Sequence, residues 1–497
     1  MSRAVLQQVA SAHTPESLAE SLRGVPGLVL LHGGLSESGA SRYSFVTADP
    51  FLAFRSSGSR CEITGAGGTS VRFGNPWRVL EQLLDRFELR DQADLPFPLG
   101  GCFGYWGYDL RRHVESRWPC QAVVDLDLPD TCVGFYDSLV VFDHRLGRTW
   151  IVSTGLAADA SRSADRAQHR FERWAARLEN QPAASEPRGA RAEDEGISLA
   201  TRPRRDLFRP VPVRSNLTRA AFLAMVRRAQ SYIQAGDIYQ VNLAQRLQTP
   251  AVASGWELFR HLTAVSPAPF AAFLDCGGWQ LVSSSPELFL RISGNHIQTR
   301  PIKGTRPRAA DPTRDAQFTY ELQTSPKEMA ELVMITDLLR NDLGRVCDYG
   351  SVQVPELVRL ERFAQVQHLV STVEGQLRAE VPHLRALAAC FPGGSITGAP
   401  KIRAMQIIDE LEPVSRGPYT GCIGYLGFNG ESQLAITIRS AICLPARTYF
   451  HVGAGIVADS IPEAEYEETV AKAGGFFAAL ESASHRRAAL AFAANRS

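Results

Sequence analysis

Apolar and polar positions show two kinds of pattern along this chain, short apolar runs and helical spacing, and together they predict a mixture of strands and helices. Short apolar runs bounded by turn residues predict strands in the first third of the sequence, at residues 28–31, 43–46 and 138–142. Apolar residues at helical spacing predict helices over 163–178 and 222–233, and Gly236 is the expected stop of the second helix.

The second half of the chain is expected to contain two hairpins and a closing helix. The first hairpin covers 287–302 around a Ser-Gly-Asn turn, so that Lys303 lies where a strand ends. The second hairpin pairs 434–444 with 448–457, and the last helix covers 462–480.

One segment interrupts these patterns and suggests how the chain is organised. Residues 181–205 are rich in Ala, Pro, Arg and Glu and have almost no large apolar side chain, which is typical of a flexible linker or loop. This segment separates an N-terminal region, 1–180, from a C-terminal region, 206–480, that carries the candidate chemistry. Residues 481–497 are expected to form a tail.

Composition and charge argue against several classes of function. The 497 residues include 53 Lys and Arg against 52 Asp and Glu, so no net field favours nucleic acid or an anionic membrane surface. No window approaches the roughly 18 uninterrupted apolar residues of a membrane span, and the N-terminus lacks a signal-peptide pattern. The nine cysteines include no Cys-x-x-Cys pair, which disfavours a zinc site or disulfide framework and favours a reducing cytoplasm.

The most informative segment is 300–308 (RPIKGTRPR), which places the Lys303 amine within five residues of three guanidinium groups. Neighbouring positive charge lowers the pKa of a lysine, and such an amine can act as a nucleophile at neutral pH. The same arginines could hold a substrate with several carboxylates, because guanidinium and carboxylate pair in a two-pronged geometry. A solvated basic loop is the alternative, and charge alone favours it.

Glutamates recur at helical spacing in two places. Capping boxes are predicted at 325–328 and 460–463, and these explain the first glutamate of each group. Glu331 lies one turn beyond the first box, while Glu465 and Glu468 share a helix face beyond the second. Two helices that each offer an inward carboxylate suit Mg²⁺, which takes oxygen ligands. Spacing alone favours the alternative of two solvated faces.

Two glycine-rich segments look like nucleotide-binding motifs but do not meet their requirements. Residues 391–401 (FPGGSITGAPK) have Ala399 where a phosphate loop needs lysine, although the Ser395 and Thr397 hydroxyls ahead of the next helix could form an anion site. Residues 453–458 continue as a strand where a dinucleotide-binding turn needs a helix to begin.

These segments together resemble the chorismate-utilising enzymes. The matching stretches occur in order as GDIYQVNLAQR (236–246), SPELF (285–289), RPIKGTRPR (300–308), ELVMITDLLRNDLGRVC (331–347), QHLVSTVEG (367–375), PGGSITGAPKIRAM (392–405), AITIRSA (435–441) and GAGIVADSIPEAEYEETVAKA (453–473). Residues 30–50 resemble the family's N-terminal part more loosely. The resemblance implies an α/β (α+β) fold of two antiparallel sheets packed between helices, with the N-terminal region in the same body.

Two positions discriminate among members of this family. Lys303 resembles the members that make 4-amino-4-deoxychorismate for p-aminobenzoate and folate, in which the lysine is thought to attack C2 of chorismate. Members that make anthranilate have alanine there. Gln240 replaces the water-activating lysine of members that add water, so the resemblance implies addition of ammonia. Anthranilate formation stays open, as does a non-catalytic protein that binds tryptophan, because 30–50 and 266–270 resemble the family's tryptophan pocket.

The resemblance also implies a set of site residues and partners. Lys303 is the nucleophile, Glu287 an acid or base near it, and His368, which alone would be interpreted as a core residue, lies beside the ring. Contacts to chorismate are implied for Gln240, Gly304, Thr305, Thr397, Arg439, Gly453, Ala454, Gly455 and Lys472. Glu331 and Glu468 resemble Mg²⁺ ligands, with Glu328 and Glu465 nearby. The sequence contains no Cys-His-Glu glutaminase region, so use of glutamine would need a separate amidotransferase subunit.

Overall fold

The computed structural model describes residues 4–34, 41–89, 95–115, 121–180, 211–363 and 365–494, with side chains described as far as residue 484. The predicted linker at 181–205 and part of the loosely matching N-terminal segment, residues 35–40, lie outside the described residues. Among the described helices, none is both long and apolar enough to cross a membrane.

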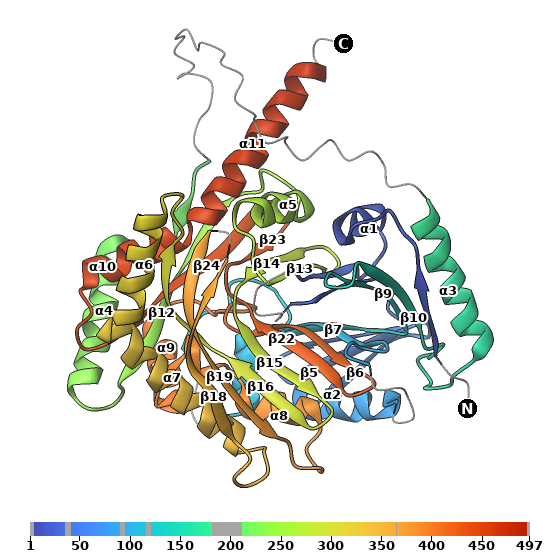
Figure 1. Cartoon of the computed structure of the whole chain (residues 1–497), viewed down its shortest axis with the longest axis horizontal. Helices are drawn as coiled ribbons and strands as arrows, with labels where there is room; N and C mark the ends of the chain where they lie inside the picture. Colours follow the sequence, from blue (N-terminus) through green and yellow to red (C-terminus); the bar gives the residue numbers. More distant parts are fainter. Residues whose placement is uncertain are drawn as a thin grey trace.

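Two large β-sheets form the centre of the molecule, and helices pack around them (Figure 1). The first sheet has the order β1-β10-β9-β3-β2-β13-β14-β23-β24-β12-β11, with β20 beside β12. Its strands are β1 (Val5–Val9), β2 (Val29–His32), β3 (Tyr43–Thr47), β9 (Ser138–Asp143), β10 (Arg148–Ser153), β11 (Arg214–Ser215), β12 (Gln240–Pro250), β13 (Phe270–Asp275), β14 (Gln280–Ser285), β20 (Gly398–Ala399), β23 (Ser440–Cys443) and β24 (Arg447–Ile456).

The second sheet has the order β17-β19-β16-β15-β22-β21-β7-β8-β4-β5-β6, with β18 beside β19. Its strands are β4 (Leu52–Ser57), β5 (Arg60–Gly65), β6 (Gly68–Phe73), β7 (Gly101–Trp106), β8 (Thr131–Tyr136), β15 (Leu288–Ser293), β16 (His296–Arg300), β17 (Ile302–Pro307), β18 (Gln353–Arg362), β19 (Val366–Gln376), β21 (Cys422–Gly427) and β22 (Glu431–Ile436). Neighbouring strands of both sheets run antiparallel, which confirms the predicted architecture.

The helices cover the outer faces and the ends of the sheets (Figure 1). They are α1 (Pro15–Ser21), α2 (Pro76–Leu84), α3 (Ala164–Glu179), α4 (Arg219–Gln234), α5 (Gly255–Val265), α6 (Pro312–Thr324), α7 (Pro326–Gly344), α8 (His383–Cys390), α9 (Lys401–Leu411), α10 (Pro462–Lys472) and α11 (Gly474–Ala494), with short 3₁₀ turns η1 (Asp85–Phe87), η2 (Tyr108–His113) and η3 (Gly394–Ile396). The strands predicted at 28–31, 43–46 and 138–142 and the helices predicted at 163–178 and 222–233 are confirmed.

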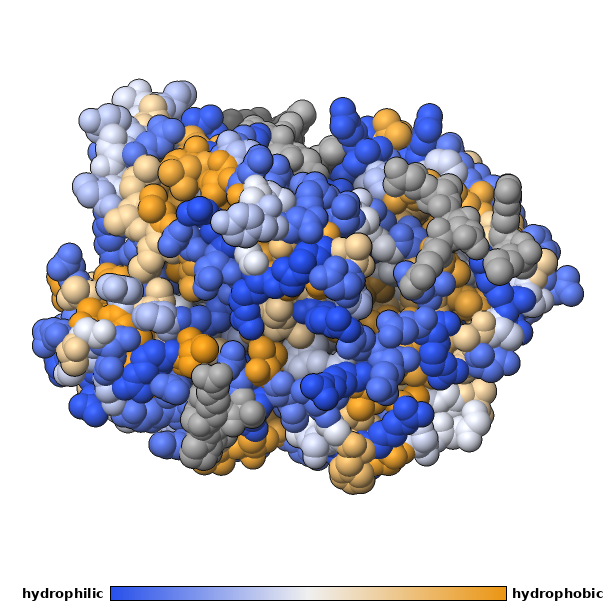
Figure 2. Space-filling view, turned by 90° about the horizontal axis from the view of Figure 1, so that it is seen from below, coloured by the Kyte–Doolittle hydropathy of each residue, from blue (hydrophilic) through white to orange (hydrophobic). Residues whose placement is uncertain are grey.

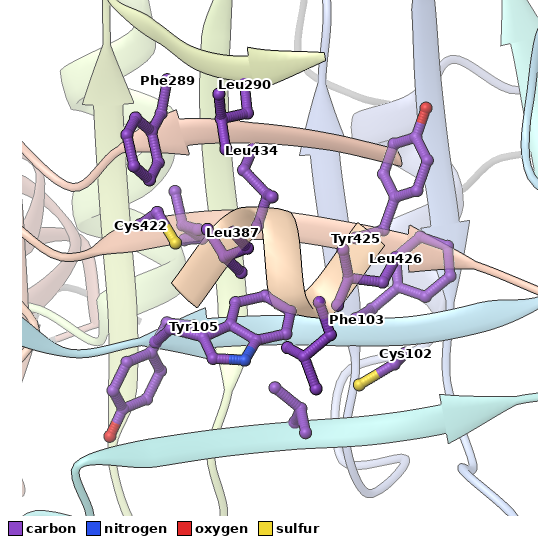
Figure 3. Close-up of a cluster of buried hydrophobic side chains, with 14 of the residues drawn as sticks. Cys102, Phe103, Tyr105, Phe289, Leu290, Leu387, Cys422, Tyr425, Leu426 and Leu434 are labelled. Atoms are coloured by element: carbon purple, nitrogen blue, oxygen red, sulfur yellow. The ribbon is translucent and has the colours of Figure 1, made fainter. Parts of the chain in front are cut away.

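Each sheet joins one block of strands from the N-terminal region to one block from the C-terminal region. In the first sheet β2 pairs with β13, and in the second β7 pairs with β21. The largest apolar core therefore combines residues of both sheets, and in one part of it Leu387 of α8 lies among side chains of β7, β15, β21 and β22 (Figure 3). On the face seen in Figure 2, hydrophilic residues dominate and hydrophobic residues appear as separate groups.

The second predicted hairpin is wrong in its first strand. Residues 431–436 form β22 of the second sheet, whereas residues 440–443 form β23 of the first, so the chain crosses between sheets inside the predicted strand. Arg439 stands at the crossing with a φ of 48°, a left-handed conformation that a regular strand does not contain. The apolar pattern hides this break because both halves are buried strands.

The end of the chain also differs from the prediction. The last predicted helix, 462–480, is two helices: α10 ends at Lys472, and α11 begins at Gly474 and continues to Ala494, through most of the expected tail. Two successive glycines at this point favour a break, because glycine has the lowest helix propensity after proline.

Neither predicted capping box forms completely. Ser325 does accept a hydrogen bond from the Glu328 N–H, but the Glu328 carboxylate lies 3.4 Å from Arg306 instead of returning to the cap. At α10 the N-cap is Ile461, and the Ser460 hydroxyl donates to Glu465 at 2.6 Å. Ser325 thus keeps its half of the capping box while Glu328 binds a tertiary partner, and Ser460 binds a glutamate of the first turn of α10.

Candidate active site

Lys303 lies on β17, at the edge of the second sheet, rather than at the end of a hairpin strand as predicted. The pairing of β17 with β19 shifts between Lys303 and Thr305, so Gly304 is the extra residue of a β-bulge. Its φ of 70° suits glycine, which lacks the Cβ that disfavours this conformation. Because of the bulge, Thr305 pairs with His368 of β19, and the Lys303 side chain projects towards Glu331 of α7.

The Lys303 amine is largely buried and lies between the two sheets and helix α7. Its Nζ is 3.9 Å from Glu331, and the two side chains are 15% and 14% exposed. A Cβ built at Gly455 of β24 would lie 4.0 Å from that Nζ and 2.5 Å from Nε2 of Gln240. Glycine at 455 therefore leaves the space into which the lysine and glutamine side chains project.

The three arginines near Lys303 in sequence do not surround its amine. Arg300 donates to Glu361 and Thr372, Arg306 lies 3.4 Å from Glu328, and Arg308 binds Asp315 at 2.9 Å. Their contacts give no support to the predicted cationic surround of the amine, and the role of these arginines in holding a substrate stays a prediction. Each guanidinium pairs with a carboxylate, and this pairing offsets the cost of removing the charged groups from water.

Four glutamates from two helices gather beside Lys303. Glu328 and Glu331 come from α7, and Glu465 and Glu468 come from α10. Burial raises the pKa of Glu331, and the neighbouring charges of Glu328 and Glu468 add to this effect while Lys303 and Lys327 oppose it. Lys327 lies 4.0 Å from Glu331 and 3.9 Å from Glu465, so its amine links the two helices.

This group of carboxylates fits the chemistry of Mg²⁺ without forming a complete site. Among the described residues, no three His, Cys, Asp or Glu side chains are already arranged to hold a metal ion. Mg²⁺, however, takes one or two carboxylates and completes its shell with water and substrate oxygens. Burial acts to raise the pKa of Glu468, but the charge and hydrogen bond of Lys472 at 2.7 Å lower it below its usual value. An ionised glutamate with a half-exposed side chain is thus available from α10.

Glu287 is buried close to Lys303, immediately before β15. Burial raises the pKa of its carboxyl to about 7, while a hydrogen bond from Ser395, the charge of Lys303 and the Ile302 backbone act in the opposite direction. A carboxyl with a pKa near neutrality can give or take a proton at the pH of a cell. The Ser395 hydroxyl, predicted to belong to an anion site, contacts this carboxyl.

His368 is buried on β19 and is neutral at physiological pH. Burial lowers the pKa of its imidazole to about 4, and the charge of Arg439 contributes. Its Nδ1 lies 2.8 Å from the Thr305 hydroxyl. The Arg439 guanidinium forms no ion pair or hydrogen bond within the described part of the chain, and burial lowers its pKa. An unpaired guanidinium in this setting is a suitable partner for a carboxylate.

The alternation of side chains along β24 decides which of the residues 453–455 can line the candidate active site. Ala454 is 0% exposed and packs in the core beneath α4 and α9. Because side chains alternate along a strand, Gly453 and Gly455 face the other way: a Cβ at Gly453 would meet Tyr419 and Asn242, and one at Gly455 would meet Gln240 and Lys303. The Lys472 amine donates to the Gly453 carbonyl at 2.9 Å.

Two predicted contact residues are thus turned away from the pocket. Ala454 presents its side chain to the core, and the buried Thr397 hydroxyl donates to the Gly393 carbonyl at 3.0 Å. Neither side chain is available to a ligand in this arrangement. Both can act only through the backbone or by shaping the pocket wall.

A buried ion pair behind the site was not predicted from the sequence. Arg416 and Glu412 bind each other through two hydrogen bonds of 2.8 and 2.6 Å. Arg416 also donates to the Asn242 carbonyl at 2.7 Å, and Glu412 accepts from the Ala244 N–H at 2.9 Å. On one edge of β12, β20 and β11 pair only with the two ends of the strand. The ion pair supplies hydrogen-bond partners for the backbone groups of Asn242 and Ala244 between those ends. It therefore holds the strand that begins with Gln240.

Replacing Gly304 by alanine is expected to distort the bulge that carries Lys303. The new Cβ would lie 2.7 Å from Leu322 and 3.0 Å from the Glu328 carboxylate, in addition to the strain of about 1–2 kcal/mol for alanine at positive φ. The matched control is Gly294→Ala, because Gly294 has a φ of 57° but nothing within 4 Å of its Cβ position. Urea denaturation should show a clearly larger loss for Gly304→Ala, and equal losses would contradict this description.

Comparison with known proteins agrees with this geometry. The model of the chorismate binding enzyme family matches residues 38–478. The chain belongs to this family. Aminodeoxychorismate synthase component 1 of Escherichia coli (strain K12) is 39% identical over 483 residues, covering 97% of this chain and 99% of the relative. The corresponding protein of Salmonella typhimurium is 40% identical over 92% of this chain and 94% of the relative.

Other members of the family are similar to almost the same degree. Anthranilate synthase component 1 of Thermus thermophilus is 40% identical, over 89% of this chain and 90% of the relative. The crystal structure of anthranilate synthase component I from Streptococcus pneumoniae TIGR4 has a TM-score of 0.74 at 30% identity, covering 90% of this chain and 94% of that chain. Overall identity therefore establishes a chorismate-utilising enzyme but does not separate these two activities.

Proposed function

We propose that this chain is the chorismate-binding component of an aminodeoxychorismate synthase, which converts chorismate and ammonia to 4-amino-4-deoxychorismate. The observation that carries the proposal is the position of the Lys303 amine, which projects between Glu331, Gln240 and the bare backbone of Gly455. A neutral amine at this position can attack an unsaturated ring whose carboxylates are held by the cationic groups of the site. The resemblance drawn from the sequence gives anthranilate-forming members alanine at this position.

The proposed reaction has two steps, and both balance. The Lys303 nitrogen forms a bond to C2 of chorismate, the ring double bonds shift, and the C4 hydroxyl leaves as water. Glu287 supplies the proton to the departing hydroxyl and recovers one from the lysine nitrogen. Ammonia then adds at C4, the double bonds shift back, and the bond from C2 to Lys303 breaks. Glu287 gives its proton to the departing lysine nitrogen and takes one from the added ammonia, which restores the free amine.

The other groups of the site would bind and orient the substrate. Arg439 and Lys472 are cations suited to the two carboxylates of chorismate. Glu331 and Glu468 would hold Mg²⁺, with Glu328 and Glu465 beside them. When bound, Mg²⁺ would supply positive charge for a substrate carboxylate. The neutral His368 imidazole, fixed by Thr305, would offer a ring nitrogen to the substrate without adding charge.

Two further partners belong to the proposal. The similar proteins are named as component 1, which supports a separate component that delivers ammonia, here a glutamine amidotransferase. A small hollow between the sheets, of about 30 Å³, is lined by 31–33 and by Pro269 and Phe270, from the two segments that resemble the tryptophan pocket, and by Ala271 and Ala272 beyond them. Bound tryptophan stays an expectation of the resemblance, since this space is smaller than its side chain.

Product identification tests the proposed function. The purified chain with chorismate, Mg²⁺ and ammonium should form 4-amino-4-deoxychorismate, which chromatography resolves from anthranilate. Anthranilate fluorescence without an added lyase would overturn the assignment in favour of anthranilate synthase. Tryptophan binding without turnover of chorismate would favour a non-catalytic relative.

The role of Glu287 predicts a specific pH dependence. A carboxyl with a pKa of about 7 is mostly protonated below pH 7 and loses its proton above it. If the acid form gives a proton to the leaving hydroxyl, kcat/KM falls roughly tenfold for each pH unit above about 7. Initial rates of the native chain, measured across roughly pH 5.5–9, should show this decline beginning at about pH 7. In Glu287→Gln, activity should be low and should no longer fall with rising pH. If the variant shows the same fall in kcat/KM as the native chain, another group causes it.

A further inference from the structure

Two cysteines far apart in sequence meet at a place outside the candidate active site. Cys132 is on β8 of the second sheet, and Cys276 is in the tight turn between β13 and β14 of the first. The Cys276 thiol donates a hydrogen bond to the Cys132 sulfur. Both thiols are free, Cys276 is 3% exposed and Cys132 is partly exposed, so an oxidant in solution can reach one member of the pair.

Arg55 holds both halves of this contact. It is the register partner of Cys132 in the neighbouring strand β4, so the two side chains lie on one face of the second sheet. Its Nη2 also donates to the Cys276 carbonyl at 2.6 Å, which fixes the turn of the first sheet. A guanidinium beside a thiol favours the thiolate, the form of cysteine that reacts with oxidants.

The electrostatic environment distinguishes the two sulfurs. The hydrogen bond from Cys276 lowers the pKa of the Cys132 thiol, burial opposes it, and the charge of Arg55 lowers it further. Burial raises the pKa of Cys276, and its hydrogen bond to Cys132 adds to that effect. Asp275 acts against the thiolate of Cys132, and the Tyr105 hydroxyl is neutral nearby. Cys132 is thus the more acidic thiol of the pair.

The other cysteines do not share this environment. Burial raises the thiol pKa of the remaining described cysteines, which are Cys61, Cys102, Cys347, Cys390, Cys422 and Cys443. A buried cysteine in apolar surroundings is inert. The contrast makes one pair, rather than cysteines in general, the expected site of oxidation.

We propose that Cys132 and Cys276 form a redox-sensitive thiol pair that closes a reversible disulfide between the two sheets. The Cys132 thiolate attacks a hydroperoxide, takes one oxygen with its proton to become a sulfenic acid, and releases hydroxide or an alkoxide, which is protonated by water. The Cys276 sulfur then attacks the Cys132 sulfur, and the sulfenic hydroxyl leaves as water with the Cys276 proton. The peroxide accepts the two electrons, and an external dithiol restores both thiols. The inference does not depend on the proposed function.

Peptide mapping of the full chain tests this proposal. The reduced protein is treated with limiting hydrogen peroxide, alkylated, digested and analysed by mass spectrometry, and the same sample is reduced again with dithiothreitol. We expect a peptide pair joined through Cys132 and Cys276, formed at least about tenfold faster than oxidation of any other described cysteine. Unmodified Cys132 and Cys276 alongside oxidised Cys61 or Cys347 would overturn the proposal, as would cross-links between other cysteines.

Variants separate the roles of the two sulfurs and of the arginine. Cys276→Ser should stop at a sulfenic acid on Cys132 that dimedone traps, whereas Cys132→Ser should leave Cys276 reduced. Arg55→Met should shift the pH profile of Cys132 alkylation to higher pH, which a merely structural role would not do. Cys61→Ser is the matched control and should oxidise like the native chain. The mapping of the native chain remains decisive even if a variant does not fold.

Discussion

Replacing Lys303 by alanine is expected to lower kcat/KM for aminodeoxychorismate formation by at least about 100-fold, because the proposed attacking group is lost. The residual reaction is expected to shift partly towards anthranilate, the product of family members that have alanine there. The alanine also removes the positive charge next to Glu331, so the loss in rate contains an electrostatic contribution. Steady-state rates with ammonium as the nitrogen donor, together with product chromatography, measure both effects.

Lys303→Arg is the matched control for the charge. Arginine keeps a cation beside Glu331 but is always protonated and does not attack carbon. If Lys303 is the nucleophile, the arginine variant is as inactive as the alanine variant. If Lys303 serves only to neutralise Glu331, arginine restores much of the activity and the covalent role is wrong.

Replacing Arg416 by methionine is expected to destabilise the folded chain by about 3–5 kcal/mol, because it leaves Glu412 buried without its partner. The variant also removes the donor to the Asn242 carbonyl on β12, the strand that begins with Gln240. Urea denaturation followed by tryptophan fluorescence measures the stability. The Michaelis constant for chorismate is expected to rise in the fraction that stays folded.

An exposed ion pair provides the control for this effect. Arg228 and Glu410 are 3.8 Å apart, and their side chains are 57% and 37% exposed. Solvent screens such a pair, so Arg228→Met should cost no more than about 1 kcal/mol. Equal losses for Arg228→Met and Arg416→Met would show that the buried pair does not support β12.

The sequence predicts the elements of this fold better than it predicts their connections. Alternation and helical spacing locate strands such as 138–142 and helices such as 222–233, because these signals are local. They miss the crossing at Arg439, where one apolar run belongs to two sheets. They also miss the Arg416–Glu412 pair, since a buried charge in a loop has no local signature.

The residues of the candidate site could be predicted from the sequence, but their surroundings could not. Motif segments indicate Lys303, Glu331 and Glu468, and the structure brings them together from β17, α7 and α10. The electrostatics near Lys303 could not be predicted from neighbours in sequence, because the arginines of 300–308 pair with Glu361, Glu328 and Asp315, which are distant in sequence. Which face of a strand or loop a residue occupies decides its role, and for Ala454 and Thr397 that depended on tertiary packing.

The most direct measurement is the mass of the Lys303 peptide after the chain meets chorismate and Mg²⁺ without any ammonia. The account predicts a covalent adduct on Lys303 with the mass of chorismate less one water, which disappears when ammonium is added and 4-amino-4-deoxychorismate is released. A peptide that stays unmodified, in a preparation that makes 4-amino-4-deoxychorismate at full rate once ammonium is supplied, would contradict it.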